Sequence, residues 1–141
     1  MYGRATVCLS IAEQRRINGF QNRCIREIVG IKPAYTSRIS NARVLAEAQK
    51  TKATTILDQR RLALLGKILR LPEGHPMKLV SFMPGTMRAA TDEYVRRVGR
   101  PNKEWAPEVL NIARRLVGSD ADILRLAQCP MRWREVVKMN Q

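Results

Sequence analysis

The strongest constraint on the fold is the segment 10–30, SIAEQRRINGFQNRCIREIVG, which carries both a start and a stop signal for an α-helix. Ser10 and Glu13 have the spacing of a capping box, in which each side chain bonds the backbone N–H of the other residue. Gly30 suits the position just after a helix, where the backbone turns left-handed. Aromatic residues make up only 5% of the chain, whereas Leu, Ala and Arg recur throughout. This composition favours helix elsewhere as well.

The apolar and basic side chains of segment 10–30 fall on opposite sides of a helical wheel. The apolar stripe consists of Ile17, Phe20, Cys24, Ile25 and Ile28. The basic side consists of Arg15, Arg16, Arg23 and Arg26. We expect the stripe to face the core. The arginines are then either a solvated face or a contact for nucleic acid.

Capping and stop residues predict further helices along the chain. Ser40 suits the start of a short helix over 41–50, after a turn-rich connector. A longer helix is expected to begin near Thr54 or Thr55, to carry Asp58 in its first turn and to end before Pro72. More helices are predicted over 76–82, 107–117, 120–128 and 130–139. The sequence therefore predicts an all-α protein of six or seven helices.

The stretch 83–104 interrupts this helical pattern. It holds Gly, Pro and basic residues without sustained periodicity, and it contains a Gly-Arg-Pro motif. These features are typical of a linker or exposed loop. We therefore expect an N-terminal helical lobe over 1–82 and a C-terminal helical lobe over 105–141, joined by a basic linker.

The charge balance points to an anionic partner. Lys and Arg number 26 against 12 Asp and Glu, which gives a formal net charge of +14. This excess must lie on the surface, where it repels itself unless an anion is present. Nucleic acid is the commonest such anion, followed by an acidic membrane or an acidic protein.

Two further clusters of cations are candidates for binding phosphates, because guanidinium groups bind phosphate oxygens in a bidentate manner. The first, on the helix that precedes Pro72, consists of Arg60, Arg61, Lys67 and Arg70. The second, around the Gly-Arg-Pro turn, consists of Arg96, Arg97, Arg100 and Lys103. Trp105 follows this turn and either stacks on a base or packs a helix start. Trp133 is expected in the core.

No pattern of residues indicates an active site. The acidic residues form no pair suited to acid–base catalysis, and the chain has no glycine-rich phosphate loop. The single histidine, His75, lies in a turn, and with Cys8, Cys24 and Cys129 it has no zinc-ligand spacing. We therefore expect no catalytic residue, metal, cofactor or small-molecule substrate.

The cysteines and the lack of long apolar runs indicate the compartment only broadly. Unpaired cysteines suit a reducing, intracellular setting. No apolar run approaches the roughly 18 residues of a membrane span, so membrane contact is not expected. Arg4 and Ser10 would suit a mitochondrial presequence, yet Met1 is retained. The nucleus and the mitochondrion both stay open.

Five separated motifs along the chain together resemble one family. In order, they are YGRATVCLS…RRINGFQNRCIREIVGI, ISNARVLAEA, RRLALLGKILRLPEGHP, VGRPNKEW and LAQCPMRWREVV. Their order and spacing over residues 2–138 resemble the region after the reverse transcriptase core of non-LTR, LINE-type retrotransposon polyproteins. The resemblance implies a helical thumb and C-terminal extension that contacts template RNA or target DNA and carries no catalytic residue.

The positions that match the family are Arg60, Arg61, Leu65, Gly66, Leu71, Pro72, Gly99, Arg100, Pro101, Trp105, Trp133 and Arg134. Ala5 and Val7 stand where the family usually has Glu and Trp, and Lys67 where it commonly has His. The polymerase palm with its paired aspartates, the endonuclease and the zinc knuckle are missing. The resemblance thus implies a part of the element that binds and does not react.

Two functions remain open at the level of sequence. One is a non-catalytic nucleic-acid-binding module, for RNA in preference to DNA. The other is a structural subunit of a large assembly, such as an organellar ribosome or another multi-subunit complex, in which the charge neutralises ribosomal RNA or acidic neighbours.

Overall fold

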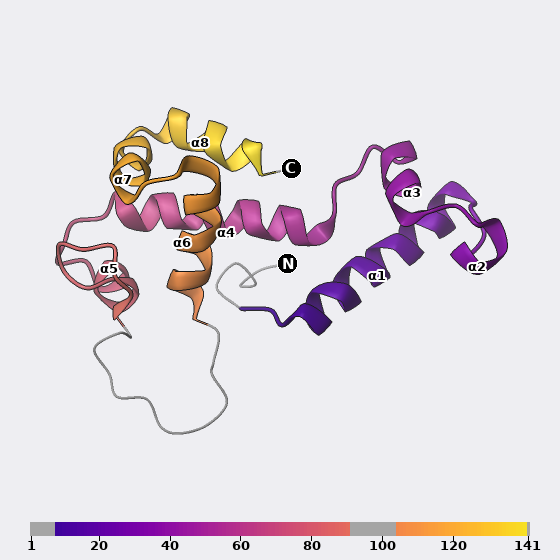
Figure 1. Ribbon diagram of the computed structural model, residues 1–141, viewed down its shortest axis with the longest axis horizontal. Coiled ribbons are helices and arrows are strands. Elements are labelled where there is room, and N and C mark those ends of the chain that lie inside the picture. Colours follow the sequence, from indigo (N-terminus) through magenta and orange to yellow (C-terminus); the bar gives the residue numbers. More distant parts are fainter. Residues whose placement is uncertain (1–7, 91–103, 141) are drawn as a thin grey trace, which may run out of the picture. The chain divides into compact units, whose positions relative to one another are not determined.

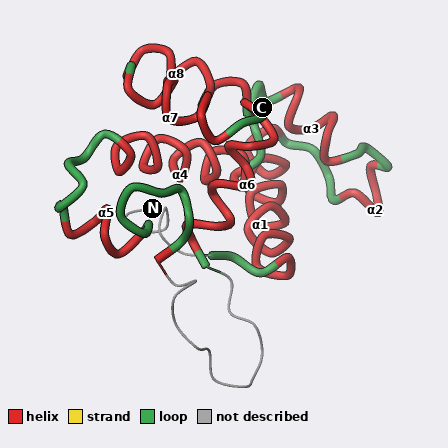
Figure 2. Tube along the Cα trace, turned by 60° about the vertical axis from the view of Figure 1, so that its left-hand side comes forward, coloured by secondary structure: helices red, strands yellow, loops and turns green. Residues whose placement is uncertain are grey.

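The fold is all-α throughout the residues that the structure describes. The computed structural model describes residues 8–90 and 104–140, which form eight helices and no β-strand (Figure 1, Figure 2). The helices are α1 (Ile11–Val29), α2 (Ala34–Ser37), α3 (Asn41–Glu47), α4 (Ala53–Leu69), α5 (Pro76–Ser81), α6 (Trp105–Val117), α7 (Asp120–Gln128) and α8 (Pro130–Met139). The predicted fold class is confirmed, with the one-turn helix α2 added inside the expected connector.

The helix starts follow the capping residues read from the sequence. Ser10 Oγ accepts a hydrogen bond from the Glu13 N–H, and the Glu13 carboxylate accepts one from the Ser10 N–H at 2.7 Å. Gly30 ends α1 with a φ of +74°, as a left-handed cap requires. The side chains of Ser40 and Ser119 cap α3 and α7 in the same way. Local sequence thus determines where these helices begin.

Contacts divide the described residues into two compact units: Leu9–Leu57, and Asp58–Asn140 together with Cys8. The predicted lobes 1–82 and 105–141 are not confirmed, because residues on both sides of 83–104 share one core. The first part of the predicted linker also packs on that core: Phe82 pairs with Ala89, which is buried. Residues 91–103 lie outside the described part of the chain.

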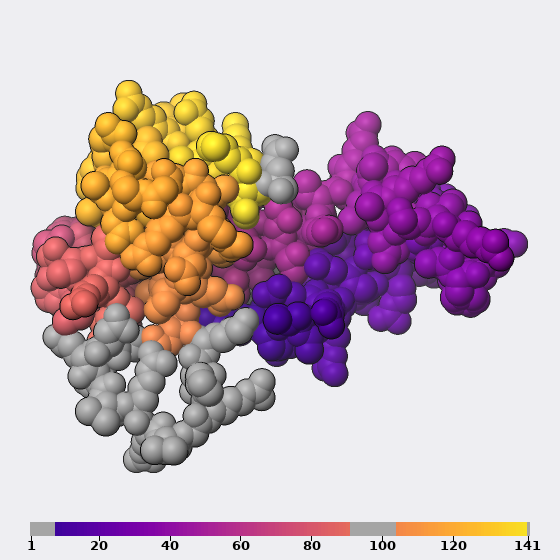
Figure 3. Space-filling view, viewed as in Figure 1, coloured from indigo at the N-terminus to yellow at the C-terminus, as the bar shows by residue number. Residues whose placement is uncertain are grey.

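The Asp58–Asn140 unit is built around leucines of α4. Its buried cluster comprises Leu62, Leu65, Ile68, Leu69, Phe82, Ala89, Ala106, Val109, Leu110, Ile112, Ala113, Ile123, Ala127, Trp133 and Val136. Figure 3 shows α6, α7 and α8 packed against one another in orange and yellow. Most of these side chains are aliphatic, and their burial is the main favourable term in the folding of this unit.

Trp133 joins α8 to α4 at the centre of this unit, as predicted for a core tryptophan. Its side chain is 2% exposed, and the indole Nε1–H donates to the carbonyl oxygen of Leu62 at 2.8 Å. The indole lies directly against Gly66, where any Cβ atom would overlap it. Glycine at position 66 therefore allows the close approach of the two helices.

The Leu9–Leu57 unit has a smaller core. Leu9, Val44, Leu45 and Leu57 are buried, and α1 packs on α3. Side-chain amides of α1 cap the start of α4: Asn18 Oδ1 accepts from the Thr54 N–H at 3.3 Å, and Gln21 Oε1 from the Ala53 N–H at 2.7 Å. These bonds satisfy backbone donors that the first turn of a helix leaves open.

The predicted apolar stripe of α1 is not a buried core face. Phe20 is 64% exposed and Ile28 is 83% exposed, whereas Ile17, Cys24 and Ile25 are only half-buried. The prediction was wrong because α3 is only seven residues long and offers too little apolar surface to cover a helix of nineteen. This unit therefore leaves large apolar side chains on its surface.

We expect Gly66→Ala to lower the free energy of unfolding by about 1–3 kcal/mol, since its methyl group overpacks the contact with Trp133. This cost exceeds the gain in helix propensity of up to about 1 kcal/mol. Gly19→Ala is the matched control, because a Cβ atom at this helical position meets no atom within 4 Å. Gly19→Ala should stabilise the protein. Urea unfolding followed by circular dichroism measures both, and a shift of both variants in the same direction would contradict the role of Gly66.

Candidate nucleic-acid interface

The arginines of α1 divide between the surface and the interior. Arg15, Arg16 and Arg23 are exposed, as expected for a basic helix face. Arg26, by contrast, is 5% exposed and is the buried residue of this helix. The prediction that Arg26 belongs to the exposed basic face is therefore corrected.

Neutral oxygen atoms hold the buried guanidinium of Arg26. Its nitrogens donate to the carbonyl oxygens of Lys32 at 3.0 Å and Ile39 at 2.6 Å. They also donate to Asn41 Oδ1 at 3.0 Å and Ser37 Oγ at 3.3 Å. Arg26 thus ties α1 to the connector and to the start of α3. Such bonds to a charged donor are stronger than those between neutral groups.

The four cations predicted on α4 also separate into two classes. Arg60 and Lys67 are exposed and lie two turns apart on one face. Arg61 is 1% exposed, and Arg70 is half-buried with its guanidinium donating to the Ala127 carbonyl oxygen at 2.8 Å. Arg61 is therefore corrected from a surface candidate to a structural residue.

Arg61 is the centre of a partly buried charge cluster. Its Nη1 atom lies 3.1 Å from Asp58 Oδ1 and 3.9 Å from Glu108 Oε1 on α6. Burial raises the pKa of Asp58, although the Arg61 charge acts to lower it. Asp58 was expected in the first turn of its helix, but α4 begins at Ala53, so this carboxylate lies one turn further along. Its role is to pair with Arg61.

The second predicted cluster, Arg96, Arg97, Arg100 and Lys103, lies outside the described residues, as does Gly99. Its proposed contact with phosphate stays a prediction. The candidate interface that the structure supplies comes instead from α4 and α8.

Helices α4 and α8 run antiparallel (Figure 1). The register is fixed by contacts of Gln59 with the Asn140 carbonyl oxygen, of Leu62 and Gly66 with Trp133, and of Arg70 with the end of α7. Core residues lie on one side of this seam, with Leu65 on α4 and Val136 on α8. The opposite sides of the two helices therefore form one continuous surface.

Four exposed cations occupy that second side. They are Arg60, Lys67, Arg134 and Lys138, which we name the α4–α8 basic flank. Arg134 and Lys138 are one turn apart on α8, and the helical register places them on the same side of the seam as Arg60 and Lys67. The sequence alone offered no sign of this grouping, since it depends on how α8 packs on α4.

The basic flank carries an excess of positive charge. None of its four cations forms an ion pair within the described residues. The one acid of α4, Asp58, is bound to Arg61, and the one acid of α8, Glu135, is exposed between Arg134 and Lys138 in sequence without an ion pair to either. Other acids of this unit pair with other cations, as in Glu73–Lys78, Asp120–Arg114 and Asp122–Arg125. With four cations and one neighbouring acid, Glu135, the flank keeps an excess of positive charge that can attract an anion.

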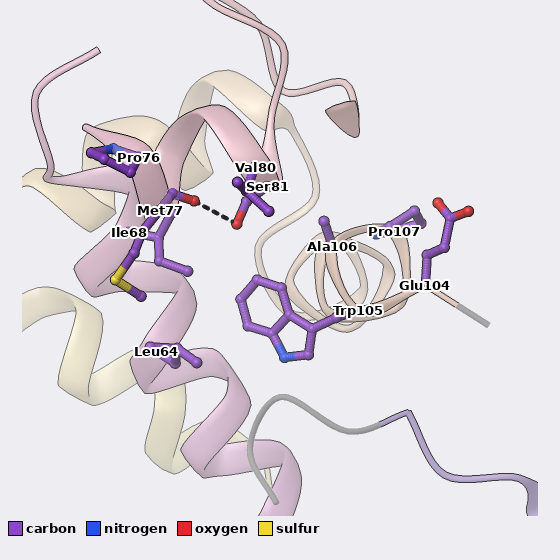
Figure 4. Close-up of a pocket in the computed structure, with 10 residues that line it drawn as sticks. All are labelled: Leu64, Ile68, Pro76, Met77, Val80, Ser81, Glu104, Trp105, Ala106 and Pro107. Carbon is purple, nitrogen blue, oxygen red and sulfur yellow. Dashed lines mark hydrogen bonds between the residues drawn. The ribbon is translucent and has the colours of Figure 1, made fainter. Parts of the chain in front are cut away.

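Trp105 lies in an apolar hollow of about 490 Å³ between α4, α5 and the start of α6. Figure 4 shows its indole facing Leu64, Ile68 and Met77. The ring is partly buried and packs against the core cluster. This arrangement agrees with the packing interpretation of Trp105, and base stacking by its remaining exposed surface stays a prediction.

His75 and the cysteines, the other residues considered for a site, have simple surroundings. His75 caps α5, with Nδ1 accepting from the Met77 N–H at 3.2 Å. Among the described residues the cysteines form no disulfide, and no group of His, Cys, Asp or Glu is suited to a metal ion. None of the described helices is both long and apolar enough to cross a bilayer.

Comparison with known proteins gives no relative: no family model, no curated protein and no solved structure matches this chain. Any function must therefore be inferred from the chain itself.

We expect Arg26→Met to destabilise the protein by roughly 2–4 kcal/mol, because several part-buried acceptors lose their donors. Arg23→Met, on the exposed face of the same helix, should change stability by less than about 0.5 kcal/mol. Urea denaturation followed by circular dichroism compares the two. Equal urea midpoints for both variants would show that the hydrogen bonds of Arg26 do not stabilise the protein.

Proposed function

We propose that this chain is a non-catalytic nucleic-acid-binding module, for RNA in preference to DNA, that holds phosphates with its exposed cations. The observation that carries the proposal is the α4–α8 basic flank. Its four cations share one surface and lack acidic partners among the described residues. A group of exposed cations without ion pairs on two packed helices suits a phosphate backbone.

The arrangement of acids supports this proposal. In the Asp58–Asn140 unit, Glu73, Asp120 and Asp122 are paired with cations outside the basic flank, and Glu135 is the one acid beside the flank on α8. The surplus positive charge is thereby concentrated on particular surfaces. Binding a polyanion would release its condensed counterions, which provides the favourable free energy of non-specific nucleic-acid binding.

The preference for RNA and the origin of the module come from the resemblance to the retrotransposon region. Under this proposal the chain retains the part of a reverse transcriptase that grips the template. Two matched positions, Gly66 and Trp133, lie against each other in the core. Their contact gives a physical reason why both would be needed in one protein. The proposed setting is intracellular, in the nucleus or the mitochondrion.

The structural-subunit alternative is favoured by a different observation. Large apolar side chains lie exposed in the Leu9–Leu57 unit, including Phe20 at 64%, Ile28 at 83% and Tyr35 at 87%. Apolar surface of this kind is often covered by a protein partner. In this alternative the basic surfaces neutralise ribosomal RNA or acidic subunits.

We expect the chain to bind single-stranded RNA with an affinity that falls steeply as salt rises. Replacing Arg60, Lys67, Arg134 and Lys138 together by Ala should weaken binding, because these side chains no longer neutralise phosphates. The slope of log K against log salt should flatten by roughly 0.7 for each phosphate left without a cation. Fluorescence anisotropy at several salt concentrations measures both the affinity and the slope.

The matched control removes four other exposed cations, Lys32, Arg43, Lys50 and Lys52, for the same change in charge. It should weaken binding less. If both quadruple variants lose affinity equally, net charge alone accounts for binding. If neither loses any, the basic flank is not an interface.

Native size fractionation separates the two functions. A structural subunit is expected to migrate with a large particle from which high salt does not remove it. A free binding module should migrate as a small species after nuclease treatment. Persistence of the large particle after nuclease and salt would contradict the module.

A further inference from the structure

The Leu9–Leu57 unit contains a hollow of about 590 Å³ between one face of α1 and the segment that follows Gly30. Residues of α1 that line it recur at helical spacing, including Asn22, Arg23 and Glu27. Ile31, Pro33 and Tyr35 form the facing wall. A hollow of this size with a mostly apolar lining and a few polar groups is typical of a site for a small group.

The hollow has a rigid base. The buried Arg26 also lines it, and the guanidinium bonds to Lys32, Ile39 and Asn41 fix the facing wall against α1. A hollow held open by hydrogen bonds from a buried charge is prepared for a ligand before binding. It therefore loses little entropy on binding.

Asn22, which lines the hollow, has a buried polar atom without a hydrogen-bond partner. The Oδ1 atom of Asn22 is buried and has no hydrogen-bond partner among the described residues. Buried polar atoms are nearly always paired, so the unpaired acceptor of this lining residue is one to which a bound ligand could donate. Glu27 adds a second acceptor to the same lining.

An aromatic ring and a cation border the hollow. Tyr35 lines it while remaining 87% exposed, and Arg23 is exposed beside it. An exposed ring beside a guanidinium is the combination on which proteins stack unpaired bases and hold the attached phosphate. The unit as a whole is basic, since residues 9–57 contain nine Lys and Arg against three Asp and Glu.

We propose that this hollow binds one unpaired nucleobase that bears an exocyclic amino group, adenine or cytosine, within a single-stranded nucleic acid. The base stacks on Tyr35 and donates from its amino group to Asn22 Oδ1, while Arg23 contacts the phosphate. This inference rests on the proposed function and adds a preference for unpaired bases. Phosphate contacts alone give no such preference.

The test compares binding of the full chain to oligoadenylate, oligouridylate and duplex RNA of equal length. Tyr35→Ala should weaken binding to oligoadenylate roughly 5- to 150-fold, the range expected for removal of one base–aromatic stack. Tyr35→Phe should bind as the unchanged protein does, and duplex binding should not change. Asn22→Ala should remove the preference for oligoadenylate over oligouridylate.

Phe20→Ala is the matched control, because Phe20 is an exposed aromatic residue of α1 that does not line the hollow. The affinity of Phe20→Ala should stay unchanged, and circular dichroism confirms that each variant is folded.

If the chain binds single strands and duplex alike and Tyr35→Ala has no effect, the base site is wrong and the proposed function stands. If the chain binds no RNA at all, the proposed function itself is wrong, and the base site with it. If Tyr35→Ala abolishes only self-association, the hollow is a protein contact and the inference is overturned.

Discussion

The contact between Gly66 and the Trp133 indole is the interaction on which the Asp58–Asn140 unit depends. It brings α8 against α4, and the indole N–H bonds to the Leu62 carbonyl oxygen at 2.8 Å. Because this contact fixes the register of the two helices, it also decides which exposed cations become neighbours. Arg60 and Lys67 belong to one helix and Arg134 and Lys138 to another, and only this packing puts them on one surface. The basic flank is therefore a product of the core, and a variant that loosens the core should disperse it.

Arginine has two distinct roles in this protein, and both follow from how the guanidinium is satisfied. Arg26 and Arg61 are almost fully buried; neutral oxygen atoms hold Arg26, and the carboxylates of Asp58 and Glu108 lie against Arg61. A buried cation without such partners would cost several kcal/mol, so the surrounding chain must supply them. Exposed arginines such as Arg16 and Arg23 keep their charge in water. A count of cations overstates the charge available to a partner, because the buried ones already have acceptors.

Local signals in the sequence predicted the helices well and the long-range arrangement poorly. Ser10, Gly30, Ser40 and Ser119 act within a few residues of themselves, so their roles as caps could be read directly from spacing. The burial of Arg26 could not be read from spacing, because its partners come from the connector and α3. A helical wheel placed Phe20 on a core face, yet no element of the Leu9–Leu57 unit covers it. The basic flank and the hollow were likewise beyond prediction, since each combines residues that are distant in sequence.

The two proposed surfaces would supply different kinds of recognition. Cations on the α4–α8 basic flank can hold phosphates of any sequence, and their contribution weakens as salt screens it. The proposed base site beside Tyr35 would use stacking and a buried hydrogen bond, both of which depend much less on salt. At low salt both surfaces contribute, whereas at high salt the stacked base would account for most of the remaining affinity. A base in a duplex cannot enter the hollow, whereas the phosphates of a duplex can still contact the flank. Under the two proposals, the protein would therefore prefer single strands without hydrogen bonds that read the sequence.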